Sequence, residues 1–198
     1  MSINNHFDFL APIYDKVIKS ANNANLEALL NLPISGDLLD AGGGTGRISN
    51  LLKDRASSVF VADLSYPMLR QTIQKKGLLP VCTHSEFLPF PSNYFERIIM
   101  VDAFHHVCNQ ENTARELWRV LAPDGRIVVE EPNYHKFGVK LVAFAEKIVF
   151  MRSRFLLPEN IKSLFGFKYS NSFIEYDGYN SWIVIDKGNS SQKSTDPG

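Results

Sequence analysis

The residues that most clearly suggest chemistry form one run, Leu38 to Arg47. An apolar segment ends there in Asp40, four glycines follow at positions 42, 43, 44 and 46, and an apolar helical pattern begins at Ile48. Glycine adopts backbone angles that are closed to other residues and lets a ligand approach with no Cβ in the way. The run therefore predicts a cofactor-binding turn between a strand and a helix.

Three cofactor classes compete for such a turn. A nucleoside-triphosphate loop requires Gly-x-x-x-x-Gly-Lys-Ser/Thr, and no Lys-Ser or Lys-Thr pair follows these glycines. A dinucleotide-binding turn requires Gly-x-Gly-x-x-Gly, whereas Gly42, Gly44 and Gly46 are spaced Gly-x-Gly-x-Gly. The carboxylate of Asp40 would repel a pyrophosphate and attract a cation. S-adenosylmethionine carries a sulfonium and an amino group and no phosphate, so these residues favour it.

The elements that must hold this turn alternate along the chain. After two helical segments within residues 7–32, apolar strand patterns recur at 37–41, 58–62, 79–83, 97–101, 126–130, 167–176 and 181–186, with helical patterns at 48–52, 67–77, 112–121 and 136–165. Continuous apolar strands are typical of a parallel sheet covered on both faces. We therefore predict an α/β fold: a doubly wound, mostly parallel seven-stranded sheet with helices on both faces and a C-terminal antiparallel hairpin. Its ligands would bind beyond the carboxyl ends of the strands, where the glycine turn lies.

The composition is that of an ordinary globular chain of 198 residues, with 44% hydrophobic residues and a formal net charge of zero. This balance lacks the positive charge that nucleic-acid binding usually needs, so no nucleic-acid partner is expected. No run is long and apolar enough for stable membrane insertion, and the first residues lack the apolar core of a signal peptide. Cys82 and Cys108 have neither disulfide nor zinc-site spacing, so we expect free thiols and no metal. We also expect a cytoplasmic protein that is a monomer or a homodimer.

Five segments of the chain resemble the motifs of one known family. Asp40-Ala41-Gly42-Gly43-Gly44-Thr45-Gly46 is similar to the first motif of class I S-adenosylmethionine-dependent methyltransferases. Later motifs of the family are resembled, in the family's order, by residues 62–69, 88–96, 101–107 and 116–125. The resemblance covers residues 36–131. It implies a Rossmann-like methyltransferase fold, S-adenosylmethionine as methyl donor, S-adenosylhomocysteine as product and a small-molecule or lipid-like acceptor.

The resemblance also implies which residues bind the methionine and ribose parts of the cofactor. The backbone of Ala41, Gly42 and Gly44 would pack against the methionine part, and Asp40 would attract its amino group. Asp63, about 20 residues beyond the glycines, would accept hydrogen bonds from both ribose hydroxyls. The alternative for Asp63 is the N-cap of the following helix.

Two neighbouring segments would bind the adenine ring. Leu64 and Met68 would press on the ring, although Met68 fits a core contact nearly as well. At the position where the family often has an acidic residue facing the adenine amino group, this chain has His84. The imidazole of His84, the carboxylate of Glu86 or the backbone at Ser85 would then make that contact.

Residues near the transferred methyl group follow the fourth predicted strand. Asp102 would line the cofactor pocket, and His105 or His106 would act as a base or orienting group for the acceptor. The alternative is that both histidines only cap the next helix and line the pocket. A base is needed only where the acceptor must lose a proton.

The N-terminal segment resembles the opening of small-molecule methyltransferases, including those of ubiquinone and menaquinone synthesis. This resemblance makes Tyr14 a further cofactor contact. The quinone signature after the fourth strand, an Arg-Asn pair behind an aromatic-Gly pair, is absent, and Phe104-His105-His106-Val107 stands there instead. We therefore assign no quinone acceptor from the sequence.

We expect one domain over residues 1–187 and a disordered polar tail over 188–198. Its parts would be a pair of N-terminal cap helices, a cofactor-binding core and a substrate-side region, at 7–32, 36–131 and 132–187. Residues 132–165 are rich in Phe, Lys and Arg. They could form a membrane-surface helix for a lipophilic acceptor, or a helix packed on the sheet with a charged outer face.

Two other functions share some of these features. A non-catalytic module that binds S-adenosylmethionine or S-adenosylhomocysteine would have the same turn and the same Asp63. A nicotinamide-dependent oxidoreductase is disfavoured by the glycine spacing and by the absence of a Tyr-x-x-x-Lys pair. Methyl transfer is the leading prediction.

Overall fold

The structure is a computed structural model that describes residues 23–133, 154–178 and 180–188. Its α-helices and single turns of 3-10 helix (η) are α3 (Asn23–Leu29), α4 (Ser49–Leu52), η1 (Lys53–Arg55), α5 (Tyr66–Ile73), η2 (Phe104–His106), α6 (Gln110–Val120) and α8 (Pro158–Leu164). Its strands are β1 (Leu38–Ala41), β2 (Val59–Asp63), β3 (Leu78–Cys82), β4 (Phe95–Val101), β5 (Leu121–Pro132), β6 (Ser170–Asp177) and β7 (Asn180–Lys187).

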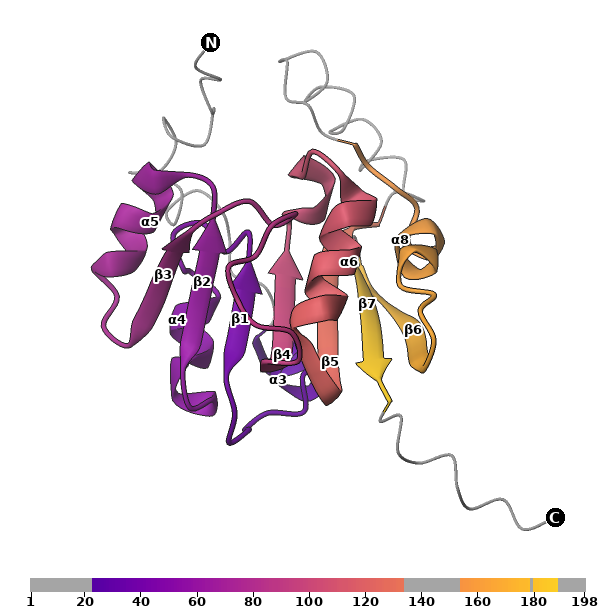
Figure 1. Cartoon of the computed structure of the whole chain (residues 1–198), viewed down its shortest axis with the longest axis horizontal. Coiled ribbons are helices and arrows are strands. Elements are labelled where there is room, and N and C mark those ends of the chain that lie inside the picture. The colour runs from indigo at the N-terminus through magenta and orange to yellow at the C-terminus, as the bar shows by residue number, and fades with distance from the viewer. Residues whose placement is uncertain (1–22, 134–153, 179, 189–198) are drawn as a thin grey trace, which may run out of the picture.

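These strands form one sheet in the order β3-β2-β1-β4-β5-β7-β6 (Figure 1). The pairs from β3 to β5 are parallel, and β7 runs antiparallel to both β5 and β6. The chain winds outward from β1 to β3 and then crosses to the other side of β1 as β4. The predicted doubly wound sheet with its antiparallel C-terminal hairpin is thus confirmed. The winding reverses between β1 and β4, which is where ligands bind in such sheets.

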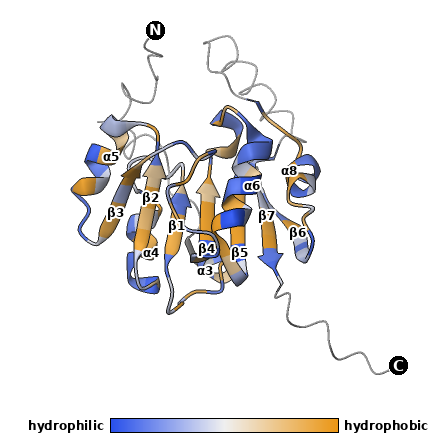
Figure 2. Ribbon diagram, viewed as in Figure 1, coloured by the Kyte–Doolittle hydropathy of each residue, from blue (hydrophilic) through white to orange (hydrophobic). Residues whose placement is uncertain are grey.

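Two apolar cores lie on opposite faces of the sheet, because successive residues of a strand point to opposite faces. Leu39 of β1 belongs to the core under α6 and α8, whereas Leu38 belongs to the core under α3, α4 and α5. All four residues of β1 are buried. Figure 2 shows the central strands as largely apolar between helices that have one apolar side. This double coverage explains why the strand sequences are continuous apolar runs.

Two element boundaries differ from the prediction. The fifth strand, predicted at 126–130, begins earlier, since β5 starts at Leu121 and includes residues 123–125. The helix predicted throughout 136–165 is wrong at residues 154–157, which are not helical. Pro158 disfavours helix in the residue before it, and Leu157 accordingly has an extended ψ of 146°. The proline then occupies the first turn of α8, where its missing N–H costs nothing.

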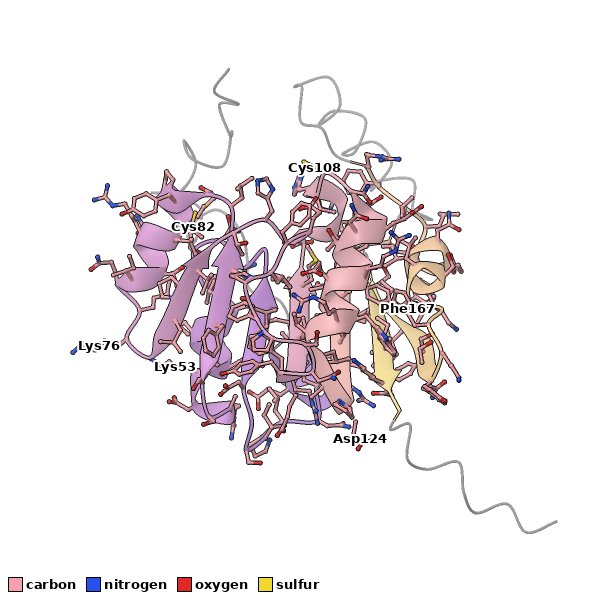
Figure 3. The ribbon with its side chains drawn as sticks, viewed as in Figure 1. Lys53, Lys76, Cys82, Cys108, Asp124 and Phe167 are labelled. Carbon is pink, nitrogen blue, oxygen red and sulfur yellow. The ribbon has the colours of Figure 1, made fainter. Side chains whose placement is uncertain are left out.

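Several predictions fall on residues that the structure does not describe. These include Tyr14, the first helix of the 7–32 pair, the segment 134–153 and the tail beyond 188. Within the described ranges, no helix is long and apolar enough to cross a membrane. Cys82 and Cys108 are exposed free thiols, as their spacing predicts. Figure 3 shows both at the end of the sheet where the parallel strands terminate.

Candidate functional site

The glycine turn follows β1 and packs directly against the segment that follows β4. Gly42, Gly44 and Gly46 have φ angles of 73°, 54° and 70°, which L side chains rarely adopt. A Cβ added to Gly42 would lie 2.7 Å from the Cβ of Ala103. Glycine is therefore required here both by backbone conformation and by close approach. The turn and the end of β4 form one edge of the site.

Helix α5 supports the turn from the other side. The hydroxyl of Thr72 donates to the carbonyl of Gly44 at 2.9 Å, and the ammonium of Lys75 donates to the carbonyl of Thr45 at 2.6 Å. The sequence analysis did not predict these two residues as part of the site. Both carbonyls belong to residues of the glycine turn. The two side chains therefore hold the turn in one conformation.

Asp63 ends β2, and its carboxylate joins two segments of backbone. One oxygen accepts from the N–H of Gly44 at 2.9 Å, and the other accepts from the N–H of Ser65 at 2.7 Å. The N-cap of α5 is Ser65, whose hydroxyl accepts from the N–H of Met68. The helix-cap alternative for Asp63 is therefore wrong. A carboxylate offers about four acceptor positions, and these two bonds occupy two of them.

Asp40 lies beneath the turn and not on its open side. Its side chain is 2% exposed, and it accepts a 2.6 Å hydrogen bond from the hydroxyl of Ser49 in α4. A Cβ on Gly43 would lie only 2.5 Å from its Cγ, so the turn covers the carboxyl closely. Burial raises the pKa of Asp40 to about 6, the Ser49 bond lowers it and the charge of Asp63 raises it further.

Carboxyl groups gather where four neighbouring strands end. Asp40 and Asp63 belong to β1 and β2, Asp102 follows β4, and Glu130 lies near the end of β5. Burial raises the pKa of Glu130 to about 8, and the charge of Asp102 adds to this rise. Arg47 is the cation that lowers the pKa of both Asp40 and Glu130. Because Glu130 favours its neutral form, the negative charge of this edge comes from the aspartates, and it favours a cationic ligand over a diphosphate.

Glu130 and Trp182, which are paired across two strands, each have a buried polar atom with no hydrogen-bond partner among the described residues. The residues are directly paired between β5 and β7, so their side chains lie on the same face. One oxygen of Glu130 accepts from the amide of Asn180 at 2.6 Å. Its other oxygen and the indole nitrogen of Trp182 are buried with no hydrogen-bond partner among the described residues. A carboxyl in this setting favours its protonated form.

His105 makes a short contact with a carboxylate of β5. Its Nδ1 lies 2.6 Å from Oε2 of Glu131 in β5, and the side chains are 5% and 4% exposed. The other oxygen of Glu131 accepts from the N–H of Phe104 at 2.8 Å. The ring of Phe155 stacks on the imidazole with centroids 4.2 Å apart. His105 is therefore held in one orientation.

The next residue, His106, has a ring centroid 3.9 Å from that of His105. Burial lowers the pKa of His106 to about 3, and the neighbouring His105 lowers it further, so the ring is neutral at neutral pH. Asp102 begins this segment with a φ of 49° and donates its N–H to the carbonyl of Glu130. The sequence analysis missed Glu131, although its position at the end of the fifth predicted strand was a usable signal.

The predicted adenine residues separate into exposed and buried groups. Leu64 is 48% exposed and His84 is also exposed, whereas Met68 is 3% exposed and has the burial of a core residue. Glu86 is buried, and its carboxylate accepts from the N–H of Asn109, the N-cap of α6. Glu86 thus ties its loop to α6. Leu64 and the segment from His84 to Ser85 follow the adjacent strands β2 and β3, where they could flank a ring.

A separate cleft of about 470 Å³ opens at the opposite end of the sheet. It is lined by Asp124, which Figure 3 shows at that end, and by Arg126 and Asp186. Arg126 is bonded to Asp186 through two hydrogen bonds of 2.6 and 3.0 Å and to the carbonyl of Leu29. The guanidinium of Arg126 is thus paired with a carboxylate and a carbonyl of the fold itself. This cleft is remote from the glycine turn and belongs to the packing of β5 and β7 on α3.

Comparison with known proteins identifies a domain over this site. Residues 39–129 match the family model described as "Methyltransferase domain". The chain is 35% identical over 110 residues to a ubiquinone/menaquinone biosynthesis C-methyltransferase of Erwinia tasmaniensis, covering 50% of this chain and 44% of that protein. It is 33% identical over 122 residues to a demethylmenaquinone methyltransferase of Thermus thermophilus, covering 57% and 56%. The chain thus spans about half the length of the curated relatives it matches.

The fold has close counterparts among solved structures. One is a Thermotoga maritima protein described as an S-adenosylmethionine-dependent methyltransferase and possible histamine N-methyltransferase. The two structures align with a TM-score of 0.74 and 20% sequence identity, and the alignment covers 91% of this chain and 98% of that one. At this identity the likeness shows the fold alone. The matched domain, the seven-stranded sheet and the glycine turn together make this chain similar to the class I S-adenosylmethionine-dependent methyltransferases.

Proposed function

We propose that this protein transfers the methyl group of S-adenosylmethionine to a small-molecule or lipid-like acceptor. The observation that carries the proposal is the acidic edge around the glycine turn, where Asp40, Asp63 and Asp102 lie at the ends of neighbouring strands. The cofactor would supply a methyl group activated by its positive sulfonium, and S-adenosylhomocysteine would be the product. The excess of carboxyl groups there suits that positive charge.

The described residues suit each part of the cofactor. Gly42 and Gly44 present backbone without side chains to the methionine part, and Asp63 would accept hydrogen bonds from the ribose hydroxyls. Leu64 is exposed beside them for the adenine ring, with His84 and Ser85 on the next loop. Asp40 supports the turn from below, and its charge acts on the cofactor through the turn. Tyr14 is proposed as a further contact from outside the described residues.

The names of the relatives suggest which acceptors to test first. Proteins named for ubiquinone and menaquinone synthesis methylate a carbon atom of their acceptor, and the matched region covers residues 39–129 of this chain. We therefore place a reduced naphthoquinone headgroup, 1,4-naphthalenediol, first among the candidate acceptors. Phe104-His105-His106-Val107 stands where the quinone signature would be, so phenols, catechols and amines belong in the same panel.

Calorimetry with S-adenosylmethionine, S-adenosylhomocysteine and NAD tests the cofactor. Binding of both adenosyl compounds without NAD is expected, and tight binding of NAD alone would overturn the proposal. Transfer of a radiolabelled methyl group to the acceptor panel then tests the reaction. Cofactor binding without transfer to any acceptor would favour the non-catalytic binding module over the enzyme.

A further inference from the structure

The segment after β4 brings a buried histidine to the edge where the acceptor must approach. His105 lies in η2, two residues after Ala103, which packs against the glycine turn at Gly42. Binding at the end of β1 places the reacting part of a ligand near the switch between β1 and β4. A side chain in this segment is therefore suited to contact a methyl acceptor.

The hydrogen bonds of Glu131 determine which nitrogen of His105 carries a proton. An ionised carboxylate only accepts hydrogen bonds, so we infer from the 2.6 Å separation of Nδ1 and Oε2 that Nδ1 carries a proton. Oε1 is held by the N–H of Phe104 at 2.8 Å, which prevents the carboxylate from turning away. In a neutral imidazole with a protonated Nδ1, Nε2 carries the lone pair. His105 is thereby prepared to accept a proton through Nε2.

The surroundings of the ring fix its plane and favour a positive charge after proton transfer. Phe155 stacks on one side at 4.2 Å, and the ring of His106 lies 3.9 Å away. The described charged or titratable residues that neighbour His105 include Glu131 from β5, His106 from its own segment and Arg154, whose backbone N–H donates to the carbonyl of His105. Among them Glu131 makes the direct contact, and its negative charge stabilises an imidazolium.

We propose that His105 is the general base of the methyl transfer, that Glu131 is its positioning residue, and that the acceptor is a phenol or aromatic diol. The proposal rests on the proposed methyltransferase function. Nε2 of His105 takes the proton of the acceptor hydroxyl, and the electron pair of the broken O–H bond remains on the acceptor. The acceptor oxygen, or a ring carbon activated by it, bonds the methyl group as the bond from methyl to sulfur breaks and its electrons stay on sulfur. For attack by carbon, the ring hydrogen leaves as a proton and restores aromaticity.

This assignment separates two classes of acceptor. A neutral phenol is a weak nucleophile until its proton is removed, so a positioned base accelerates its methylation by about 100-fold or more. A neutral amine attacks through its own lone pair and loses its proton after transfer, so it gains little from such a base. His106 is unsuited to the role because burial keeps its pKa at about 3. The pair of His105 and Glu131 therefore predicts a hydroxyl-bearing acceptor.

Nuclear magnetic resonance of the full chain labelled with ¹⁵N-histidine tests the pair without turnover. At neutral pH we expect His105 to carry its proton on Nδ1, and Glu131→Gln to give a mixture of tautomers, because the amide can either accept or donate. Glu111→Gln, an exposed glutamate on α6, is the matched control and leaves the His105 signals unchanged. A proton on Nε2 of His105 in the unaltered protein would overturn the proposal.

Kinetics with 1,4-naphthalenediol under reducing conditions, and with catechol, phenol and histamine, test the role of the pair. We expect His105→Gln to lower kcat for hydroxyl acceptors about 100-fold or more, with the Kd for S-adenosylmethionine within about twofold. Glu131→Gln should lower kcat and move the acid limb of its pH profile to lower pH, and Glu131→Asp should recover part of kcat.

Three outcomes would contradict the proposal. They are a kcat of His105→Gln within about threefold of the unaltered protein, methylation confined to histamine, and methylation of no member of the panel by a protein that binds the cofactor. Failure to bind S-adenosylmethionine at all would instead remove the proposed function. The NMR experiment still reads the state of His105 in that case, so the two failures are distinguishable.

Discussion

The carboxylate of Asp63, at the end of β2, accepts a hydrogen bond from the backbone N–H of Gly44, 2.9 Å away in the turn after β1. The residue expected to bind ribose and the turn expected to bind methionine are therefore one connected unit. A second bond, to the N–H of Ser65, fixes the same carboxylate from the other side. A change at Asp63 should act on cofactor binding through both its own contacts and the conformation of the turn.

Replacing Asp63 tests this unit directly. We expect Asp63→Ala to lower the affinity for S-adenosylmethionine about tenfold or more, because at least one hydrogen bond to a charged acceptor is lost. Isothermal calorimetry measures this change. Asp54→Ala in η1 is the control, since Asp54 is exposed, and it should leave the affinity unchanged. An unaltered affinity in Asp63→Ala would show that the carboxylate only holds the two backbone segments.

The glycines of the turn should divide into one that matters for binding and one that matters for folding. Among the described residues, a Cβ on Gly44, which has a φ of 54°, would come within 4 Å only of the carboxylate of Asp63, at 3.9 Å. A Cβ on Gly46 would lie 2.8 Å from Cδ1 of Leu78 in the core. Both variants carry a left-handed strain of about 1–2 kcal/mol.

We therefore expect Gly46→Ala to lower the thermal midpoint more than Gly44→Ala does. We expect Gly44→Ala to weaken cofactor binding out of proportion to its effect on folding. Thermal denaturation and calorimetry of the two variants measure these effects side by side. Equal losses of stability with unchanged binding would contradict this division.

The sequence predicted the sheet and its turn well because both depend on local pattern. Apolar runs identify strands buried on both faces, and glycine spacing marks where the backbone turns. The prediction was wrong just before a proline. The apolar residues suggest a helix that continues through 154–157, but Leu157, which precedes Pro158, is extended. A fixed φ and a missing N–H override periodicity at that point.

Side-chain roles were harder to predict because they depend on contacts between distant residues. Asp40 reads as a cofactor contact in sequence, but the structure places it beneath the turn on Ser49. Met68 was left between adenine packing and the core, and it is buried. Glu131 was missed because its partner, His105, lies 26 residues earlier in the chain. Strand order, which brings β4 beside β5, is what joins the two.

The pH dependence of stability should report on Glu130. Burial raises its folded-state pKa from 4.5 to about 8, so the folded protein retains a proton that the unfolded chain releases above about pH 4.5. The free energy of unfolding must then fall as the pH rises through this window. Glu130→Gln removes the ionisation, so it should gain stability over the unaltered protein, on the order of a few kcal/mol at pH 9 and little at pH 4.

Urea denaturation at several pH values between 4 and 9 measures this difference. Glu175→Gln on β6 is the control, because Glu175 is exposed, and its difference from the unaltered protein should not change with pH. A stability difference for Glu130→Gln that is constant across this range would show that Glu130 ionises normally in the folded protein.

The acidic edge itself can be tested by comparing two ligands that differ in one charge. S-adenosylmethionine carries a positive sulfonium, whereas S-adenosylhomocysteine has a neutral thioether in its place. Asp40 is buried beneath the turn, where its charge is weakly screened. Asp40→Asn should therefore weaken binding of S-adenosylmethionine about three- to tenfold more than binding of S-adenosylhomocysteine. The amide can still accept the hydrogen bond of Ser49, so the turn should keep its support.

Calorimetry at pH 8, above the pKa of about 6, measures both affinities with Asp40 ionised in the unaltered protein. Equal weakening for the two ligands would mean that Asp40 acts on the shape of the turn and not through its charge.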